Sequence, residues 1–172
     1  VLGIYYLTQE RPGVKGEGMV FKNVNEAILA YENGAATLHS KVKVRVSKTM
    51  PDGTVKTGTI ESTIGRFIFN EIIPQDLGFV DRSIPGNELK LEVDFHVAKK
   101  QLKQILEKVI NVHGASQTAE TLDDIKAMQP NAIIYVQSIL PINEAKFAQK
   151  YNGAMTNAKI DETNAAILQM AQ

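Results

Sequence analysis

The fold class is decided by residues 37–63, which read TLHSKVKVRVSKTMPDGTVKTGTIEST. In this stretch charged side chains alternate with Val42, Val44 and Val46, which is the two-residue period of a strand with one buried face. A Met-Pro-Asp-Gly turn signal follows, and the next run is rich in threonine, which favours β structure. We therefore predict a β-hairpin with strands over residues 37–47 and 54–63.

Upstream of the hairpin, the chain predicts a loop and a helix. Asn23 can cap a helix that ends at Asn33, because Glu26 stands three residues further on, as in a capping box. Residues 9–18 combine charge, proline and glycine and are interpreted as a loop. The apolar residues 1–8 fit either a short strand or the end of a helix.

Downstream of the hairpin, one element stays ambiguous and one is clear. The run RFIFNEII at 66–73 is compact and apolar, so its period leaves helix and strand open, and Pro74 ends it. Residues 75–94 form a long connection, of a length typical of functional or packed loops. Further on, apolar residues recur at the spacing that places them on one face of a helix: Leu102, Ile105, Leu106, Val109 and Ile110.

That spacing predicts a helix over residues 99–114, ended by Gly114, and a second helix over 118–128 that completes a helix hairpin. Beyond Pro130 a nearly continuous apolar strand is expected at 131–141, followed by helices over 143–151 and 157–171. The whole chain is therefore predicted to be α+β, with a β-hairpin and helices followed by a short β-α-α tail.

Composition excludes several classes of protein. The 172 residues carry 19 Lys plus Arg and 19 Asp plus Glu, so net charge gives no reason to expect bulk attraction to nucleic acid or membrane. No cysteine is present, which excludes disulfides, thiol nucleophiles and Cys-ligated zinc. No apolar run is long enough to span a bilayer, and no signal peptide is evident at the N-terminus. We expect a cytoplasmic chain with no membrane partner.

A row of cations on the hairpin has two interpretations. Lys41, Lys43 and Arg45 lie two residues apart on one face of the first predicted strand, about 6–7 Å from one cation to the next. They could follow the phosphates of a nucleic acid. They could equally form the solvated face of an edge hairpin, where lysine discourages aggregation. The second interpretation is favoured because aromatic residues for base stacking are missing nearby.

The sequence predicts no catalytic, cofactor-binding or metal-binding residue. His39, His96 and His113 are isolated from each other and from any metal-ligand motif, so structural or surface roles are expected. The glycines of 9–18 fit neither the P-loop nor the dinucleotide fingerprint. Ser138 lies outside any nucleophile motif. No arrangement of residues here amounts to an active site.

Four long stretches nevertheless carry a resemblance: VLGIYYLTQERPGVKGEGMVF at 1–21, AYENGAATLHSKVKVRV at 30–46, STIGRFIFNEIIPQDLGFVDR at 62–82 and KKQLKQILEKVINVHG at 99–114. Together they resemble the β′ subunit of bacterial DNA-directed RNA polymerase. The Thr-x-Gly-Arg-x-x-x-Asn-Glu-x-x-Pro pattern at 63–74 is among the most specific parts.

The resemblance implies a pore and funnel segment over 1–127 of a longer polypeptide that takes part in DNA-templated RNA synthesis. In that family the Mg²⁺-holding Asp motif lies upstream of this stretch, so Mg²⁺ belongs to the parent complex and no cofactor to this segment. The implied partners are the remaining β′ and the β subunit, with DNA and RNA contacted only through the full complex.

Residues 128–172 differ from the rest of the chain in their proportion of charged residues. Residues 1–127 carry 16 basic and 16 acidic side chains, about a quarter of the segment, whereas 128–172 carry three of each, about an eighth. With the stretch QPNAIIYVQSILPIN at 129–143 and the expected helix NAKIDETNAAILQMA at 157–171, the tail is similar to the C-terminal part of an SGNH, or GDSL-type, acylhydrolase. We expect a second domain over 128–172 and a junction near 125–130, as in a chimera. The alternative function is a fragment of such a hydrolase, whose catalytic motifs are absent here.

Overall fold

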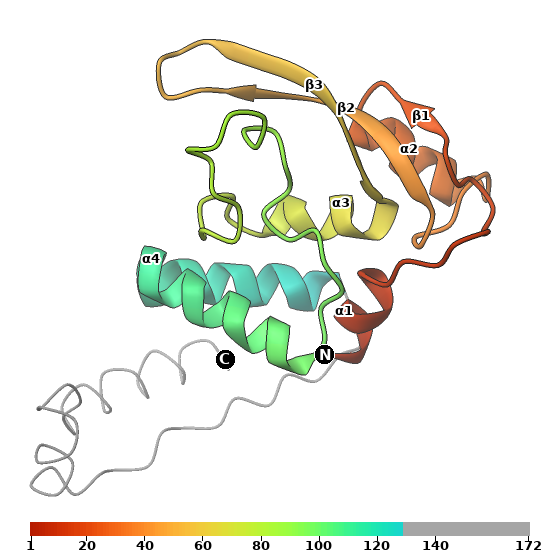
Figure 1. The fold of residues 1–172 in the computed structure, drawn as a ribbon. Helices are drawn as coiled ribbons and strands as arrows, with labels where there is room; N and C mark the ends of the chain where they lie inside the picture. The colour runs from red at the N-terminus through yellow and green to blue at the C-terminus, as the bar shows by residue number, and fades with distance from the viewer. Residues whose placement is uncertain (129–172) are drawn as a thin grey trace, which may run out of the picture. The chain divides into compact units, whose positions relative to one another are not determined.

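A computed structural model describes residues 1–128 of the chain (Figure 1). Its elements are α1 (Leu2–Leu7), β1 (Val20–Phe21), α2 (Val24–Glu32), β2 (Lys41–Thr49), β3 (Val55–Thr63), α3 (Ile64–Ile72) and α4 (Lys99–Ala127). The α+β prediction is confirmed. One compact unit spans 1–112 and a second begins at His113. The strand and helices predicted beyond residue 130 lie outside the described residues, and the 127/128 domain boundary stays a prediction.

The hairpin forms as predicted, but its first strand starts later. β2 and β3 are antiparallel and pair without interruption from Lys41 opposite Thr63 to Thr49 opposite Val55. The prediction that the strand begins at residue 37 is wrong. The Thr37 N–H donates to the Ser40 hydroxyl, and the Ser40 N–H donates to the Thr37 carbonyl. These local bonds hold a turn instead of a strand.

A third strand, β1, was not predicted. Its two residues run parallel to β2, with Val20 beside Lys43 and Phe21 beside Val44. The Lys43 N–H donates to the Met19 carbonyl at 2.9 Å. Two residues are too few to show any periodicity, so only the tertiary pairing reveals this strand. The sheet order is β1-β2-β3.

Helix α2 matches its prediction and shows why. The Asn23 side chain accepts a hydrogen bond from the Glu26 N–H at 2.8 Å, and the Glu26 carboxylate in turn accepts from the Lys22 N–H at 2.7 Å. Two free N–H groups at the helix start are thereby satisfied. Asn33 and Gly34, which has φ 66°, end the helix.

The ambiguous run at 66–73 is helical, as part of α3. Thr63 caps this helix, since its hydroxyl accepts a hydrogen bond from the Arg66 N–H. The helix buries Phe67 and Phe69, which are 2% and 0% exposed. The N-terminal run is also helical, as α1, so the strand alternative does not hold there.

The core lies between the sheet and the helices beside it. One cluster of buried side chains joins β1, α2, β2 and α3: Phe21, Ala27, Ala36, Val42, Val44, Ile64 and Phe67. Each comes from residues 21–67, so the hairpin and the helices on either side of it in the sequence share one apolar centre.

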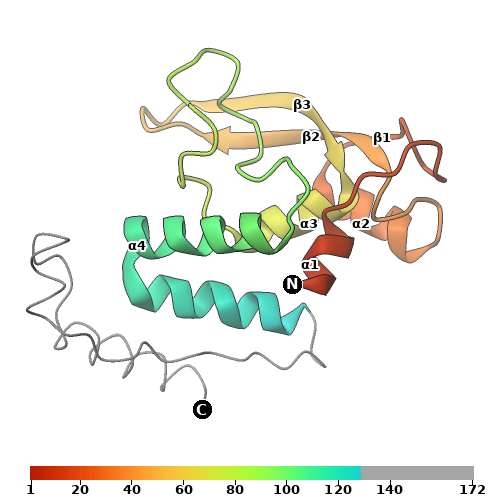
Figure 2. The ribbon, with the colours of Figure 1, turned by 60° about the horizontal axis from the view of Figure 1, so that its bottom comes forward.

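The predicted connection lies between α3 and α4 and contains no helix or strand. It runs beside the hairpin in both views (Figures 1 and 2). Two hydrogen bonds fasten it to β3: Lys56 Nζ donates to Glu88 at 2.5 Å, and the Ser62 hydroxyl donates to Asp94 at 2.5 Å. The connection is therefore a packed loop.

Helix α4 is interrupted where the sequence predicts it. Gly114 has φ 80° and ψ −175°, which is not helical, so α4 consists of two helical segments. In the first, Ile105 and Val109 are fully buried, as expected from the apolar spacing. The second starts directly after Gly114 and not at residue 118. Among residues 1–128, no helix is both long enough and apolar enough to cross a bilayer.

Candidate functional site

The structure gives two histidines packing roles. His39 donates from Nδ1 to the Gln9 carbonyl at 3.0 Å, and its ring meets the Tyr6 ring edge-on. His96 donates from Nε2 to the Tyr5 carbonyl at 3.0 Å, and its ring contacts the Tyr5 ring at an interplanar angle of 56°. Within residues 1–128, no three His, Asp or Glu side chains are grouped to hold a metal ion.

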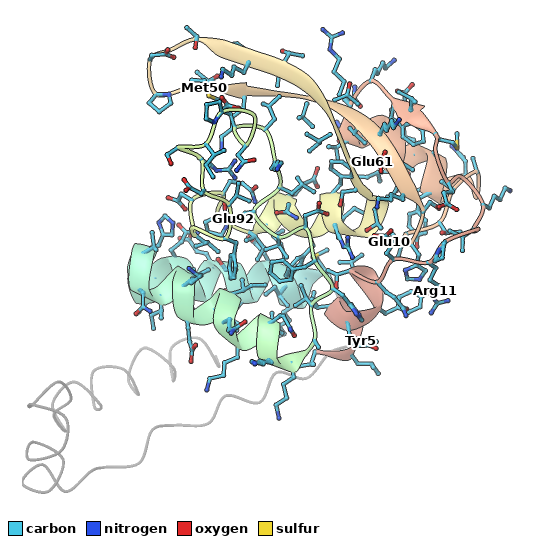
Figure 3. All side chains as sticks on the ribbon, viewed as in Figure 1. Tyr5, Glu10, Arg11, Met50, Glu61 and Glu92 are labelled. Atoms are coloured by element: carbon cyan, nitrogen blue, oxygen red, sulfur yellow. The ribbon has the colours of Figure 1, made fainter. Side chains whose placement is uncertain are left out.

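The row of cations on the hairpin, Lys41, Lys43 and Arg45, is partly neutralised by ion pairs. Lys41 lies 3.3 Å from Glu10 and 3.9 Å from Glu61, and Lys43 lies 3.9 Å from Glu61. Figure 3 shows Glu10 and Glu61 at the same end of the hairpin. This pairing supports the solvated-face interpretation. The two-residue strand β1 pairs with β2 at Lys43 and Val44, so this side of β2 is covered there but not along its whole length.

The 63–74 motif brings α1 and α3 together, and Gly65 permits their close approach. A Cβ atom at Gly65 would lie 1.9 Å from the Leu7 carbonyl oxygen, far inside any permitted contact. The Gly65 N–H also donates to the Leu38 carbonyl at 2.8 Å. Glycine is therefore required at this position by the backbone of α1.

Arg66 is the centre of a buried polar cluster. Its side chain is only 10% exposed, and Nε donates to the Thr8 carbonyl at 3.0 Å. One terminal nitrogen lies 3.3 Å from Glu10 and 3.5 Å from Asp94. Arg66 thus joins the end of α1, the N-terminal loop and the 73–98 connection. Guanidinium suits this task because its donors diverge in a fixed plane.

Asn70, one turn further along α3, clamps the same connection. Its amide NH₂ donates to the carbonyls of Arg66 and Val93, both at 2.8 Å. Its amide oxygen accepts from the Val93 N–H at 3.0 Å and from the Gln75 side chain at 3.1 Å. Since Thr63, Arg66 and Asn70 are spaced 3 and 4 residues apart, the sequence places them on one helical face. That spacing is the signal that could have predicted the cluster.

A second polar centre organises the connection itself. The Glu92 side chain is fully buried, accepts from the Phe79 and Val80 N–H groups and lies 3.1 Å from Arg82. Arg82 also donates to the carbonyls of Gln75, Asn87, Glu88 and Lys90. One ion pair therefore satisfies backbone groups that a loop without secondary structure leaves free. The sequence did not single out either residue.

The charges of Arg82 and Glu92 also influence the pKa of Lys48 on β2 of the hairpin. Burial lowers the pKa of Lys48 from its ordinary value, and the positive charge of Arg82 lowers it further. Glu92 and Asp76 act on this pKa in the opposite direction. Lys48 is thus part of the charge balance around the connection.

Taken together, these polar side chains bond to backbone and to one another. Arg66, Asn70, Arg82 and Glu92 each have several protein partners, which is the arrangement of a scaffold. The expectation that no catalytic residue is present stays a prediction. What the geometry supplies is the rigid attachment of α1, α3 and the connection to one another.

Comparison with known proteins agrees with the resemblance seen in the motifs. Residues 1–137 match the family described as RNA polymerase Rpb1, domain 3. The chain is 66% identical over 128 residues to the DNA-directed RNA polymerase subunit β′ of Lachnoclostridium phytofermentans, and 56% identical to those of Acetivibrio thermocellus and Clostridium acetobutylicum.

These alignments cover 74% of this chain but only 10–11% of each relative, so the chain spans about a tenth of the length of the β′ subunits it matches. The family match covers most of the chain and includes every element described above. The chain therefore belongs to the RNA polymerase Rpb1 domain 3 family.

Proposed function

We propose that this chain is a non-catalytic segment of an RNA polymerase β′ subunit, whose complete complex carries out DNA-templated RNA synthesis. The observation that carries the proposal is the 63–74 motif. Its glycine lets α1 approach α3 closely, and its arginine and asparagine bond to the N-terminal segment and to the connection. The segment then contributes a rigid wall to the pore and funnel region of the complex.

The proposed partners are the remaining β′ polypeptide and the β subunit, with DNA and RNA reached only through the assembled cytoplasmic enzyme. Exposed apolar side chains support this proposal. Leu2 is 81% exposed and Tyr6 is 51% exposed, both on α1. The two side chains are one helical turn apart on α1, and a second protein that covers them would remove both from water.

Mg²⁺ belongs to the proposed parent enzyme and not to this segment. Residues 1–128 contain no fitting group of ligands, and the acidic side chains of the Arg66 cluster already pair with Lys41 and Arg66. We propose that parts of the parent enzyme outside residues 1–128 hold the metal.

Reconstitution tests the proposal. The chain is mixed with the β subunit, the other core subunits and two β′ fragments that flank the segment, and RNA synthesis is measured on a DNA template. We expect synthesis only when the chain is included and none from the chain alone. Nucleotide incorporation by the isolated chain, or equal synthesis without it, would contradict a non-catalytic β′ role.

The tail carries a separate proposal, that 128–172 derives from an SGNH-type hydrolase joined near 125–130. Its support is the change in charge density and the resemblance of the tail, which lies outside the described residues. The family match reaches residue 137, past that junction, so the proposal depends most on residues 138–172. Amplification of the source DNA from codon 120 to codon 172 tests it: one continuous β′ gene with this tail excludes a chimera. Cleavage of a short-chain nitrophenyl ester by the chain would favour the hydrolase alternative.

A further inference from the structure

β3 is an edge strand, and the 73–98 connection is hydrogen-bonded to it through side chains and not through the backbone. In the described sheet it pairs only with β2, and its nine residues keep an unbroken register. It contains no proline, and Lys56 and Glu61 are its only charged residues. These two charges disfavour uncontrolled pairing, but a long regular edge without proline or a bulge can still pair with another strand.

The ladder shows which backbone groups of β3 face outward. Met50 donates to Thr54 beyond one end of the hairpin, and Ile64 donates to Ser40 beyond the other. Hydrogen-bonded and non-bonded pairs alternate in an antiparallel ladder. The even-numbered residues of β3 therefore bond to β2. The N–H and C=O groups of Thr57, Thr59 and Glu61 point away from it, and they have no backbone partner in the described part of the chain.

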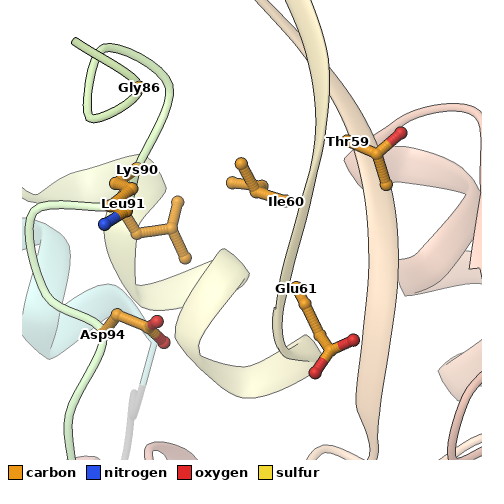
Figure 4. A pocket seen from close by; sticks show the side chains of 7 residues that line it. All are labelled: Thr59, Ile60, Glu61, Gly86, Lys90, Leu91 and Asp94. Carbon is orange, nitrogen blue, oxygen red and sulfur yellow. The ribbon is translucent and has the colours of Figure 1, made fainter.

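A pocket of about 290 Å³ opens beside this edge. Figure 4 shows Thr59, Ile60 and Glu61 of β3 on one side and Gly86, Lys90, Leu91 and Asp94 of the connection on the other. Ile60 and Leu91 form its apolar part. The pocket is large enough to admit an aliphatic side chain, and a strand pairing with the edge presents such side chains at alternate positions.

The charges around the pocket favour one kind of occupant. Glu61 is paired with Lys41 and Lys43, and Asp94 is bonded to Ser62 and Arg66. Lys90 is exposed and forms no ion pair with any residue in 1–128. A carboxylate on the incoming strand could form an ion pair with Lys90.

We propose that the free edge of β3 accepts an extended strand of the polymerase β′ polypeptide outside this chain. This strand places one aliphatic side chain between Ile60 and Leu91 and one carboxylate near Lys90. The inference rests on the proposed function, because the chain matches only 10% of the length of a β′ relative and the remainder supplies the polypeptide. Backbone pairing gives the affinity, and the pocket and Lys90 give the specificity.

Amide hydrogen exchange tests the edge in three samples: the full chain alone, the chain with a blocked peptide Thr-Val-Thr-Val-Thr-Val-Glu-Val-Thr, and the reconstituted polymerase. In the chain alone, Thr57, Thr59 and Glu61 should exchange fast while Gly58, Ile60 and Ser62 are protected. With the peptide and in the polymerase, the three outward amides should exchange at least about tenfold more slowly. Fast exchange of these amides in the assembled polymerase would overturn the proposal.

Two variants sharpen the test. Thr59→Pro removes an outward N–H without taking a donor from the β2 ladder, and Thr59→Val is its matched control. We expect the proline variant to lose at least about tenfold in peptide affinity and the valine variant to keep it. Lys90→Glu lies on the surface, needs no refolding of the strand, and should weaken binding of the same peptide several-fold. Equal binding by all variants would overturn the proposal.

The samples separate the two proposals. If the peptide protects the edge but the chain does not assemble with polymerase, the β′ role fails and the strand-accepting edge remains. If assembly occurs with exposed edge amides, the edge proposal fails and the β′ role remains. Protection that rises with the concentration of the chain alone would assign the edge to a second copy and overturn the choice of partner.

Discussion

At the scale of single residues, three polar residues of the 63–74 motif each make specific contacts in the structure. Thr63 caps α3, Arg66 reaches three separate segments, and Asn70 pairs with both backbone groups of Val93. Gly65 differs from these residues because the packing at this position requires that there is no side chain. The Leu7 carbonyl occupies the place where its Cβ would stand.

Gly65→Ala should therefore lower the free energy of unfolding by about 3 kcal/mol, because rigid backbone must move to admit the methyl group. Gly34→Ala is the matched control. Gly34 has φ 66° with nothing within 4 Å of a Cβ, so only the left-handed backbone is strained, at about 1 kcal/mol. Urea denaturation measures both values. An equal loss in the two variants would contradict the steric explanation.

Glu88 carries a prediction about pH. Its hydrogen bond with Lys56 holds the pKa at about 2, below the ordinary 4.5. Because the folded pKa is the lower one, the stabilisation is complete above pH 4.5 and is lost as pH falls towards 2. A carboxyl titration by NMR should show the low value in the wild type.

Lys56→Met should raise the pKa of Glu88 towards 4.5, because the lysine hydrogen bond is its largest cause. Asp81 is the internal control, since Ser83 lowers its pKa and Lys56 does not contribute. A Glu88 pKa that stays near 2 in the variant would show that Lys56 does not hold the connection in solution.

At the scale of elements, the 73–98 connection is the unusual part. It has no helix or strand, yet Val93 and Val97 are buried within it, and the Arg82–Glu92 pair bonds backbone along its length. A long connection could be predicted from glycine and proline. Its fixed path could not, because the groups that hold it come from α3, β3 and the loop itself.

Glu92→Gln tests that element. The change keeps the shape but leaves Arg82 facing a neutral group, and breaking a buried ion pair costs about 3–5 kcal/mol. The Phe79 and Val80 amides, which donate to Glu92, should also exchange faster. Glu61→Gln is the matched control on the surface and should cost less than about 1 kcal/mol. Similar losses in both variants would argue against Glu92 as the organiser of the connection.

At the scale of the whole molecule, residues 1–112 form one compact unit that includes the core cluster of the sheet, α2 and α3. Amide exchange should therefore be slowest at Val42, Val44 and Phe67, which open only with the whole unit. The hairpin turn at 50–54 should exchange fastest among the described segments of the hairpin. Turn amides as slow as those of Val44 would contradict a core centred on the sheet and α3.

The sequence by itself determined the hairpin, α2, the end of the first helical segment at Gly114 and the family. Each depends on local signals: a two-residue period, a capping side chain, a glycine, or a long motif. Tertiary structure alone decided that residues 66–73 are helical, that β2 begins at Lys41, and that β1 exists. In these places the deciding contacts join residues far apart in the chain, so no local pattern records them. The spacing of Thr63, Arg66 and Asn70 records one face of the Arg66 cluster, but the partners of Arg66 and of Glu92 are decided only when separate elements have packed together.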